Sequence, residues 1–298
     1  MALTISLLNM KGGVGKTTLA VNLAWHFYQN ESANVLLVDL DPQFNSTQYV
    51  MNYAAFDSHR KKFGTLTNLL VDQPTLNLKD TKLKKNPASA LYNVRKVKGR
   101  QFDLLPAELS LAWVVKNPAQ MEHRLEKLLE KFRDKYDYIF IDCAPTDSVL
   151  TTMALTASDF VLIPMRPDRF SILGFTNLME TIKIFRTNCP DPHLVKVSGV
   201  AFTQVIGKST VEAQSILEIK AVAKTEGIYL FDSQLSFSKS FFRSVAEQTP
   251  IFNTAFTHPK SRFAIAKIAA ELKQQIAVLT APPPAKQPVE NAKKGTKP

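Results

Sequence analysis

The residues with the clearest chemistry form a short loop near the N-terminus. Residues 11–18 read KGGVGKTT, which fits the phosphate-loop spacing G-x-x-x-x-G-K-[ST] except that Met10 takes the place of the first glycine. Glycines let backbone N–H groups curl around phosphates, Lys16 adds a point charge, and the Thr17 hydroxyl can ligate Mg²⁺. The residues predicted to contact a nucleotide are Lys11, Gly12, Gly13, Val14, Gly15, Lys16, Thr17 and Thr18.

Three aspartates stand at the ends of apolar runs that read as buried strands. Asp39 and Asp41 lie in the segment VDLDPQ, and Asp142 ends the run YIFID. Ligands of open α/β sheets bind beyond the carboxyl ends of the strands, so these side chains would face the loop. One carboxylate can orient an attacking water and others can hold the water shell of a metal, although each also fits a turn or helix cap. We predict a metal site at Thr17, Asp142 and one of the two aspartates of VDLDPQ, with the aspartates acting through water.

Lys11 places a second cation at the entrance of the same loop. Two lysines are difficult to fit around one phosphate chain from within a single subunit. On spacing alone, Lys11 is either a surface lysine beside the loop or a group that reaches the nucleotide of a second subunit. The second alternative makes Lys11 a predicted catalytic residue, together with Lys16 and one of the two aspartates of VDLDPQ.

The segments that must position these residues alternate between two patterns. Short apolar runs bounded by polar turns are typical of strands buried on both faces, and they lie at residues 3–8, 35–39, 138–142, 160–164 and 197–202. Helix-like stretches lie at residues 16–29, 121–136, 173–186 and 262–279. This alternation predicts an α/β fold, with a doubly wound, mostly parallel sheet and helices on both faces.

The composition is that of an ordinary globular chain with an excess of positive charge. The 298 residues are 45% hydrophobic and 21% charged, and the formal net charge is +11 with a pI of about 9.5. A field of that sign favours polyanions such as nucleic acid or an anionic membrane face, and it does not separate the two.

The sequence lacks the features that membrane-spanning, secreted and cysteine-ligated metal proteins need. It has no apolar run of eighteen residues, and its apolar opening, residues 1–8, is too short for the core of a signal peptide. Cys143 and Cys189 are far apart and lack C-x-x-C spacing. The cysteines therefore argue against a disulfide framework and against a thiolate-held metal or cluster.

Two segments are expected to be irregular. Residues 77–100 carry eight basic residues against Asp80 alone, which indicates a solvated basic excursion or a segment that contacts phosphates. Residues 281–298 are rich in Pro and Lys with little to bury, so they are predicted to be a disordered tail. Residues 1–280 are predicted to form one domain.

Together these motifs resemble the ParA/MinD branch of P-loop ATPases, whose phosphate loop is the deviant Walker A form. The resemblance rests on KGGVGKTT, VDLDPQ and IDCAP, and continues loosely through FDLLPA at 102–107, RPDRFSILG at 166–174 and TPI at 249–251. It implies ATP and Mg²⁺ as ligands. It also implies that Lys11 acts across a dimer interface and that Asp142 is the Walker B aspartate. Of the two aspartates in VDLDPQ, the resemblance assigns hydrolysis to Asp41, so that the catalytic residues are Lys11, Lys16 and Asp41 and the metal site is Thr17, Asp41 and Asp142.

Members of this branch have different partners. ParA-type partition ATPases bind DNA as ATP dimers, MinD-type ATPases bind membrane through a C-terminal amphipathic helix, and others are metabolic enzymes. The resemblance implies DNA contacts at Lys208, Lys239 and Arg243. Residues 262–279 could instead form a membrane-binding helix, but their alanines and few aromatic residues favour packing on the sheet. A ligase that acts on a small acid is a third reading.

The function favoured by the sequence is an ATP-dependent homodimeric switch on non-specific DNA. Its ATPase would be weak alone and stimulated by a ParB-like or adaptor protein, and its cycling would position a plasmid, chromosome or protein cargo. The alternative is a MinD-like ATPase on membrane. The protein is expected to be cytoplasmic and associated with the nucleoid.

Overall fold

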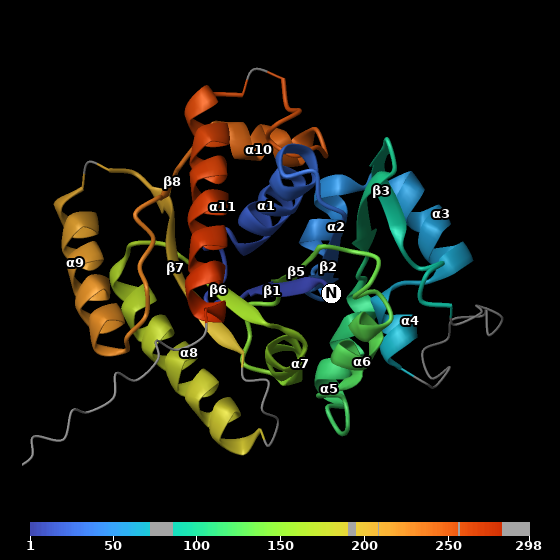
Figure 1. Ribbon diagram of the computed structural model, residues 1–298, viewed down its shortest axis with the longest axis horizontal. Helices are drawn as coiled ribbons and strands as arrows, with labels where there is room; N and C mark the ends of the chain where they lie inside the picture. Colours follow the sequence, from blue (N-terminus) through green and yellow to red (C-terminus); the bar gives the residue numbers. More distant parts are fainter. Residues whose placement is uncertain (72–85, 190–194, 208, 256, 282–298) are drawn as a thin grey trace, which may run out of the picture.

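A twisted sheet runs through the middle of the molecule, with helices on both of its faces (Figure 1). The computed structural model describes residues 1–71, 86–189, 195–207, 209–255 and 257–281. The strand order is β3-β4-β2-β5-β1-β6-β7-β8. The strands are β1 (Leu3–Leu7), β2 (Val35–Leu40), β3 (Tyr92–Val97), β4 (Arg100–Leu105), β5 (Tyr138–Cys143), β6 (Phe160–Met165), β7 (Lys196–Val205) and β8 (Leu235–Ser236).

The sheet is parallel except at one edge, which confirms the predicted doubly wound fold. Every residue of β2 and of β6 is buried, as expected for strands covered on both faces. Only the pair β3–β4 is antiparallel among the strand pairs of the described chain. Because the central strands run in one direction, their carboxyl ends meet at the same edge, where the phosphate loop and the aspartates follow them.

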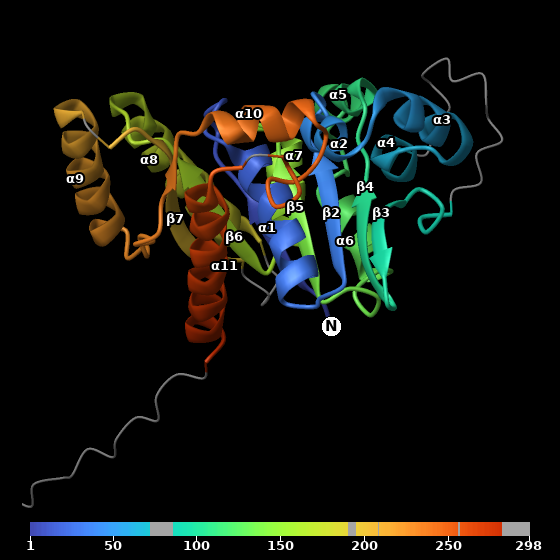
Figure 2. The same cartoon turned by 90° about the horizontal axis from the view of Figure 1, so that it is seen from above.

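Helices form one layer on each side of the sheet (Figure 2). The first face carries α1 (Lys16–Asn30), α2 (Asn45–Val50), α10 (Lys239–Ala246) and α11 (Pro259–Thr280). The second face carries α4 (Leu66–Leu70), the 3₁₀ turn Leu109–Leu111, α5 (Ala112–Lys116), α6 (Arg124–Glu130), α7 (Val149–Ala157), α8 (Arg169–Asn188) and α9 (Thr210–Thr225). α3 (Tyr53–Phe63) lies beside β3 at the sheet edge (Figure 1).

The last helix, α11, packs on the sheet as its alanine-rich sequence favours. Its apolar side is buried beside α1 and β7 through Ile265, Ile268 and Leu272. The apolar face that a membrane-binding helix would need is therefore already covered. None of the helices in the part of the chain that the structure describes is long and apolar enough to span a bilayer.

Three sequence-based expectations about elements need correction. Residues 92–97 of the basic segment form strand β3, which pairs with the apolar β4, and residues 72–85 lie outside the described residues. The helix expected at 121–136 is only α6 (Arg124–Glu130), because tight hydrogen bonds such as Phe132 N–H to Leu129 O turn the following chain. α8 begins at Arg169 rather than at 173, because the Asp168 carboxylate caps Ser171 N–H. Of the predicted tail at 281–298, only Ala281 is described.

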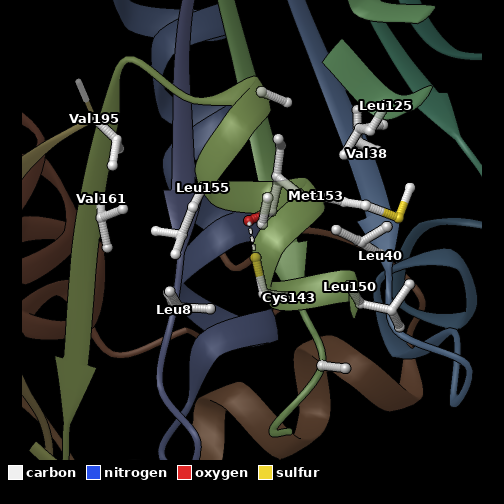
Figure 3. Packing of buried hydrophobic residues seen from close by; sticks show 14 of the residues in the cluster. Leu8, Val38, Leu40, Leu125, Cys143, Leu150, Met153, Leu155, Val161 and Val195 are labelled. Carbon is white, nitrogen blue, oxygen red and sulfur yellow. Dashed lines mark hydrogen bonds between the residues drawn. The ribbon is translucent and has the colours of Figure 1, made fainter. Parts of the chain in front are cut away.

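Cys143 is part of the hydrophobic core and is not a ligand. Its side chain packs near Leu8, Leu150 and Met153, and its thiol donates a hydrogen bond to Ile141 O (Figure 3). Burial, followed by the nearby Asp142 charge, raises the pKa of the Cys143 thiol. Both cysteines are unpaired, and the described residues contain no group of three or more His, Cys, Asp or Glu side chains suited to a metal.

Gly199 in β7 is expected to tolerate no side chain. Its φ is +141°, and an added Cβ would lie 2.6 Å from Tyr229 O and 2.8 Å from Cε2 of Phe231. Gly199→Ala should therefore lower the free energy of unfolding by roughly 2–4 kcal/mol, measured by urea denaturation. Gly174→Ala is the control, because its Cβ would meet nothing within 4 Å. Equal stability of the two variants would contradict this account.

Candidate nucleotide site

The phosphate loop connects β1 to α1 and depends on glycine for its shape. Gly13 and Gly15 have φ of +73° and +84°, a region that side-chain-bearing residues adopt with strain. Gly15 precedes α1 directly, and no side chain caps that helix. Its first N–H groups are therefore available to an anion, and the helix dipole adds positive potential at the same place.

Two side chains at the end of β7 hold the loop from behind. Thr203 Oγ1 donates a 2.6 Å hydrogen bond to Val14 O, and Gln204 Nε2 donates one of 2.6 Å to Gly13 O. These bonds use loop carbonyls, so the N–H groups on the inner side of the loop stay available for phosphates. Strand β7, which lies almost 190 residues further along the sequence, therefore positions the loop.

Lys16 lies inside the loop, as its position in the motif predicts. It is 6% exposed, and its Nζ donates to Asn9 O at 2.9 Å and to Lys11 O at 3.0 Å. Burial lowers the pKa of Lys16, while the nearby charge of Asp142 opposes that effect. A buried ammonium with only carbonyl partners is well placed to gain from a phosphate.

Asp142 has the features of a magnesium-shell ligand. It is fully buried and accepts a 2.7 Å hydrogen bond from Ser46 Oγ on Oδ2, while its Oδ1 has no partner among the described residues. The Thr17 hydroxyl lies near enough to Asp142 to lower the pKa of that carboxyl, against the raising effect of burial. A hydroxyl beside a carboxylate with a spare oxygen is a donor set that suits hydrated Mg²⁺. Thr17 and Asp142 therefore fit the predicted metal role, in which Mg²⁺ would neutralise phosphate charge.

Asp39 has a structural position. Its Oδ2 accepts from Thr47 N and Thr47 Oγ1, each at 2.8 Å, and its Oδ1 accepts from Asp41 N at 3.2 Å. Burial, followed by the adjacent Asp142, raises the pKa of Asp39 well above its usual range. Because its oxygens are occupied in this way, Asp39 anchors α2 and the chain around Asp41.

Asp41 accepts a hydrogen bond from the described protein through only one of its carboxylate oxygens. It is 6% exposed, and one oxygen, Oδ1, accepts a 2.8 Å hydrogen bond from Gln43 N. No described residue donates to its other oxygen, which is left for a water molecule. This geometry distinguishes Asp41 from Asp39, a distinction that the sequence made only through the family resemblance.

Lys11 points away from its own phosphate loop. Its Nζ lies 2.6 Å and 2.7 Å from the two carboxylate oxygens of Asp168, at the start of α8, and 3.4 Å from Ser171 Oγ. Partial burial opposes ionisation of Asp168, but the hydrogen bonds from Lys11 and Ser171 outweigh it and hold the pKa of Asp168 below its usual value. The Lys11 side chain is 30% exposed, so it lies at the molecular surface.

The comparisons with known proteins agree with this geometry. Residues 2–194 match the family model described as an AAA domain. The chain is 31% identical over 228 residues to the chromosome partitioning protein ParA of Myxococcus xanthus, and the match covers 74% of this chain and 72% of that protein. The chain belongs to the ParA family of partition ATPases. As a ParA-family protein, it is an ATPase of the class that partitions or positions a cargo.

Solved structures confirm the fold of this ParA-family ATPase. Apo McdA of Cyanothece superposes with a TM-score of 0.72 at 20% identity and covers 93% of this chain and 100% of McdA. The cobyrinic acid a,c-diamide synthase of Mycobacterium smegmatis, with bound ADP and magnesium, has a TM-score of 0.68 at 24% identity over 93% of this chain and 96% of the synthase. At these identities the likeness shows the fold alone.

Some residues of the ParA-family site escaped the sequence analysis. Asn9 Nδ2 donates to Pro164 O at 2.8 Å, and its Oδ1 accepts from Lys11 N at 2.9 Å, so it joins the loop to β6. Thr203, Gln204 and Ser46 also contact the site. Only Asn9 gave a usable signal, a polar residue between an apolar strand and the loop. The others come from distant segments that carry no pattern of their own.

A hollow of about 150 Å³ opens on the far side of the loop. It is bounded by Gly15, Thr18 and Gln204 on one side and by the exposed Phe237 and Phe242 on the other. The two rings lie 5.8 Å apart between centroids. Aromatic faces with an adjacent amide are suited to a flat heterocycle such as a nucleobase.

Of the three predicted DNA contacts, the structure describes two. Lys239 and Arg243 are both exposed on α10, whereas Lys208 lies outside the described residues. Arg243 is 3.6 Å from Glu247 Oε1, an exposed ion pair that a phosphate could replace at little cost. α10 therefore offers two cations on one face of the molecule.

Without nucleotide and Mg²⁺, Asp142→Asn should stabilise the protein above pH 6. The pKa of Asp142 is raised from 3.8 to about 6, mainly by burial, so its ionisation costs stability in full above pH 6, and this cost decreases as the pH falls from 6 towards 3.8. Asparagine is neutral throughout, so its advantage should be roughly 1–3 kcal/mol at pH 7.5 and shrink towards pH 5.5. Urea denaturation of the wild type and the variant at both pH values measures the difference in their free energies of unfolding. The contributions of the buried histidines cancel because both proteins contain them.

Asp57→Asn is the control for that experiment. Asp57 lies on the surface of α3, and hydrogen bonds from Lys61 and Arg60 lower its pKa, so its ionisation does not change between pH 7.5 and 5.5. An Asp142→Asn advantage that stayed constant across this range would contradict the raised pKa.

Proposed function

We propose that this ParA-family ATPase is an ATP-dependent dimeric switch that binds DNA without sequence preference and positions a cargo. In the proposed cycle, ATP and Mg²⁺ occupy the loop that contains Lys16 and Thr17. Two subunits then associate, DNA binds, and hydrolysis that depends on Asp41 returns the protein to single subunits. A ParB-like or adaptor protein would accelerate hydrolysis, and the protein would work in the cytoplasm on the nucleoid.

The position of Lys11 carries the proposal of a dimer. Its ammonium lies outside its own phosphate cradle, paired with Asp168 at the surface. Phe170 and Leu173, on the next turn of chain, are 81% and 71% exposed. Exposed apolar side chains beside a functional cation are typical of a surface that a partner covers. A second copy facing this surface would place Lys11 near the nucleotide of the other subunit.

The proposal of DNA binding is supported by charge. The net charge of +11 gives a positive field, and Lys239 and Arg243 concentrate part of it on α10. Contacts from lysine and arginine to phosphates bind DNA without reading its sequence, and they weaken steeply as salt rises. Phe237 and Phe242 would enclose the base of ATP in the adjoining hollow, which would link nucleotide binding to α10.

The test is binding of a random-sequence DNA duplex with ATP, ADP or no nucleotide, at low and moderate salt. Salt-sensitive binding with ATP alone is the expected result, because only the ATP dimer would present both basic surfaces. Binding to anionic liposomes in place of DNA would overturn the proposal and favour the membrane ATPase. Turnover stimulated by a small carboxylic acid, and by neither DNA nor a partner protein, would favour a ligase.

A further inference from the structure

Three buried polar side chains meet where α2 packs against both α1 and α10 (Figure 1). They are Asn22 of α1, Tyr49 of α2 and Ser244 of α10, and each is at most 1% exposed. Asn22 Nδ2 donates to the Tyr49 hydroxyl at 3.1 Å and to Thr18 O, in the first turn of α1, at 2.8 Å. The Tyr49 hydroxyl lies 2.5 Å from Ser244 Oγ. We call these three side chains the Tyr49 link.

The hydrogen bonds of the Tyr49 link have a defined direction. Ser244 Oγ donates its single hydrogen to Thr249 O at 2.7 Å, so the Tyr49 hydroxyl is the donor in its bond with Ser244. The Tyr49 oxygen accepts from Asn22, and Asn22 Oδ1 accepts from Ile251 N at 2.8 Å, which fixes the orientation of the amide. Because every hydrogen of the link is used, a shift of one helix breaks a buried bond unless the others follow.

The residues of α2 that precede Tyr49 hold the acidic end of the nucleotide site, meaning the carboxylates that follow β2 and β5. Ser46 Oγ donates to Asp142 Oδ2 at 2.7 Å. Thr47 donates to Asp39 Oδ2 through its N–H and its hydroxyl, each at 2.8 Å. A shift of α2 would therefore move three donors relative to the carboxylates that surround the predicted magnesium ion and attacking water.

A second contact joins the end of α10 to α2. Gln248 follows α10 and has φ of +49°, and its Nε2 donates to Gln48 O and Met51 O, each at 3.3 Å. A left-handed backbone at a residue with a side chain costs energy, and these bonds help to hold it. Of the eight residues of α10, two are buried, Phe241 and Ser244. A ligand that shifted this exposed helix would therefore move α2 as well.

We propose that Tyr49 is a positioning residue for ATP hydrolysis, through which the placement of α10 controls the acidic end of the nucleotide site. Its hydroxyl makes α2 and α10 move as one unit, and α2 carries the donors to Asp142 and Asp39. Chains of packed and hydrogen-bonded side chains of this kind carry coupling between sites. That DNA is the ligand of α10 rests on the proposed function, whereas the effect of Tyr49 on the rate does not.

The experiment removes the Tyr49 link from either side. Tyr49→Phe keeps the ring and removes only the hydroxyl, Ser244→Ala removes its partner on α10, and a double variant removes both. Tyr136→Phe is the matched control, because Tyr136 is also buried and its hydroxyl donates to a side chain, that of Asp103. Tyr136 precedes β5, at the edge of the sheet away from the nucleotide site. Single-turnover hydrolysis, binding of a fluorescent ATP analogue and the melting temperature are measured for all four variants.

Tyr49→Phe and Ser244→Ala should each slow hydrolysis about fivefold, the scale of one buried hydrogen bond. The double variant should be no slower than the single variants, because all three lack the same bond. Binding of the ATP analogue should not change, since the loop of residues 11–18 is intact, and normal binding also shows that the variants are folded. Tyr136→Phe should lower the melting temperature and leave the rate of hydrolysis unchanged.

Control of the site by α10 is tested by adding a random-sequence DNA duplex to the same reactions. DNA that binds the wild type should change its rate of hydrolysis. This change should be lost in Tyr49→Phe and in Ser244→Ala and kept in Tyr136→Phe. A full response to DNA in Tyr49→Phe would reject the route through this hydroxyl.

Three further results would overturn the inference and leave the proposed function intact. The first is a wild-type rate of hydrolysis in both single variants. The second is a double variant whose loss is the product of the two single losses, since independent effects multiply. The third is equal slowing by Tyr136→Phe, which would make the effect a consequence of lower stability. If the wild type ignores DNA with every nucleotide, the proposed function fails, and the rates without DNA still decide the role of Tyr49.

Discussion

Replacement of Asp41 by alanine should slow ATP hydrolysis about a hundredfold or more and leave ATP affinity nearly unchanged. Asp41 has one oxygen fixed by Gln43 N–H and one open to water, so it can orient the attacking water without holding the nucleotide. The variant should therefore remain in the ATP state, and its complex with DNA should last longer. Single-turnover hydrolysis and dissociation of labelled DNA measure the two effects.

The neighbouring Asp39→Ala is an informative control for that result. Asp39 is buried and holds Thr47, so its loss should lower the melting temperature before it affects the chemistry. A stable Asp41→Ala protein with normal hydrolysis would show that another group positions the water. If Asp41→Ala lost ATP binding as well, its role would be that of a ligand rather than a catalyst.

Replacement of Lys11 by alanine should abolish the ATP-dependent dimer and reduce turnover by roughly a thousandfold, as for other cations supplied across an interface. Lys11 makes no bond to the interior of its own loop through its side chain, so each subunit should still bind ATP. Sedimentation with ATP and binding of a fluorescent ATP analogue separate the two properties.

Lys16→Ala and Asp168→Asn give matched comparisons for Lys11. Lys16 lies inside the cradle, so its loss should abolish nucleotide binding itself. Asp168→Asn weakens the hold on Lys11 within the subunit, so it should make the ATP dimer form more readily. A Lys11→Ala protein that still dimerises with ATP would mean that Lys11 is only a surface lysine beside Asp168.

The local site was largely readable from the sequence. The loop of residues 11–18, the strand ends at Asp41 and Asp142, and the parallel sheet all follow from patterns contained within short segments. A glycine-rich turn between a strand and a helix has few alternative conformations. Few residue types can bind a phosphate chain, so a short motif is enough to predict the site.

Other features required the tertiary structure because they depend on segments distant in sequence. The clamp by Thr203 and Gln204, the pairing of Lys11 with Asp168, and the difference between Asp39 and Asp41 are all set by neighbours across the fold. The shortened α6 likewise depends on how the chain turns after it. No periodicity within a segment reports such contacts.

The sequence by itself determined that this chain has a phosphate-binding loop, acidic strand ends and a positive field. These depend on residue type and on spacing within a few residues. The tertiary structure decided which aspartate is open to water, where Lys11 points and how α10 is joined to α2. The physical reason is that hydrogen bonding and burial depend on separation in space, and folding brings together groups that the sequence keeps more than a hundred residues apart.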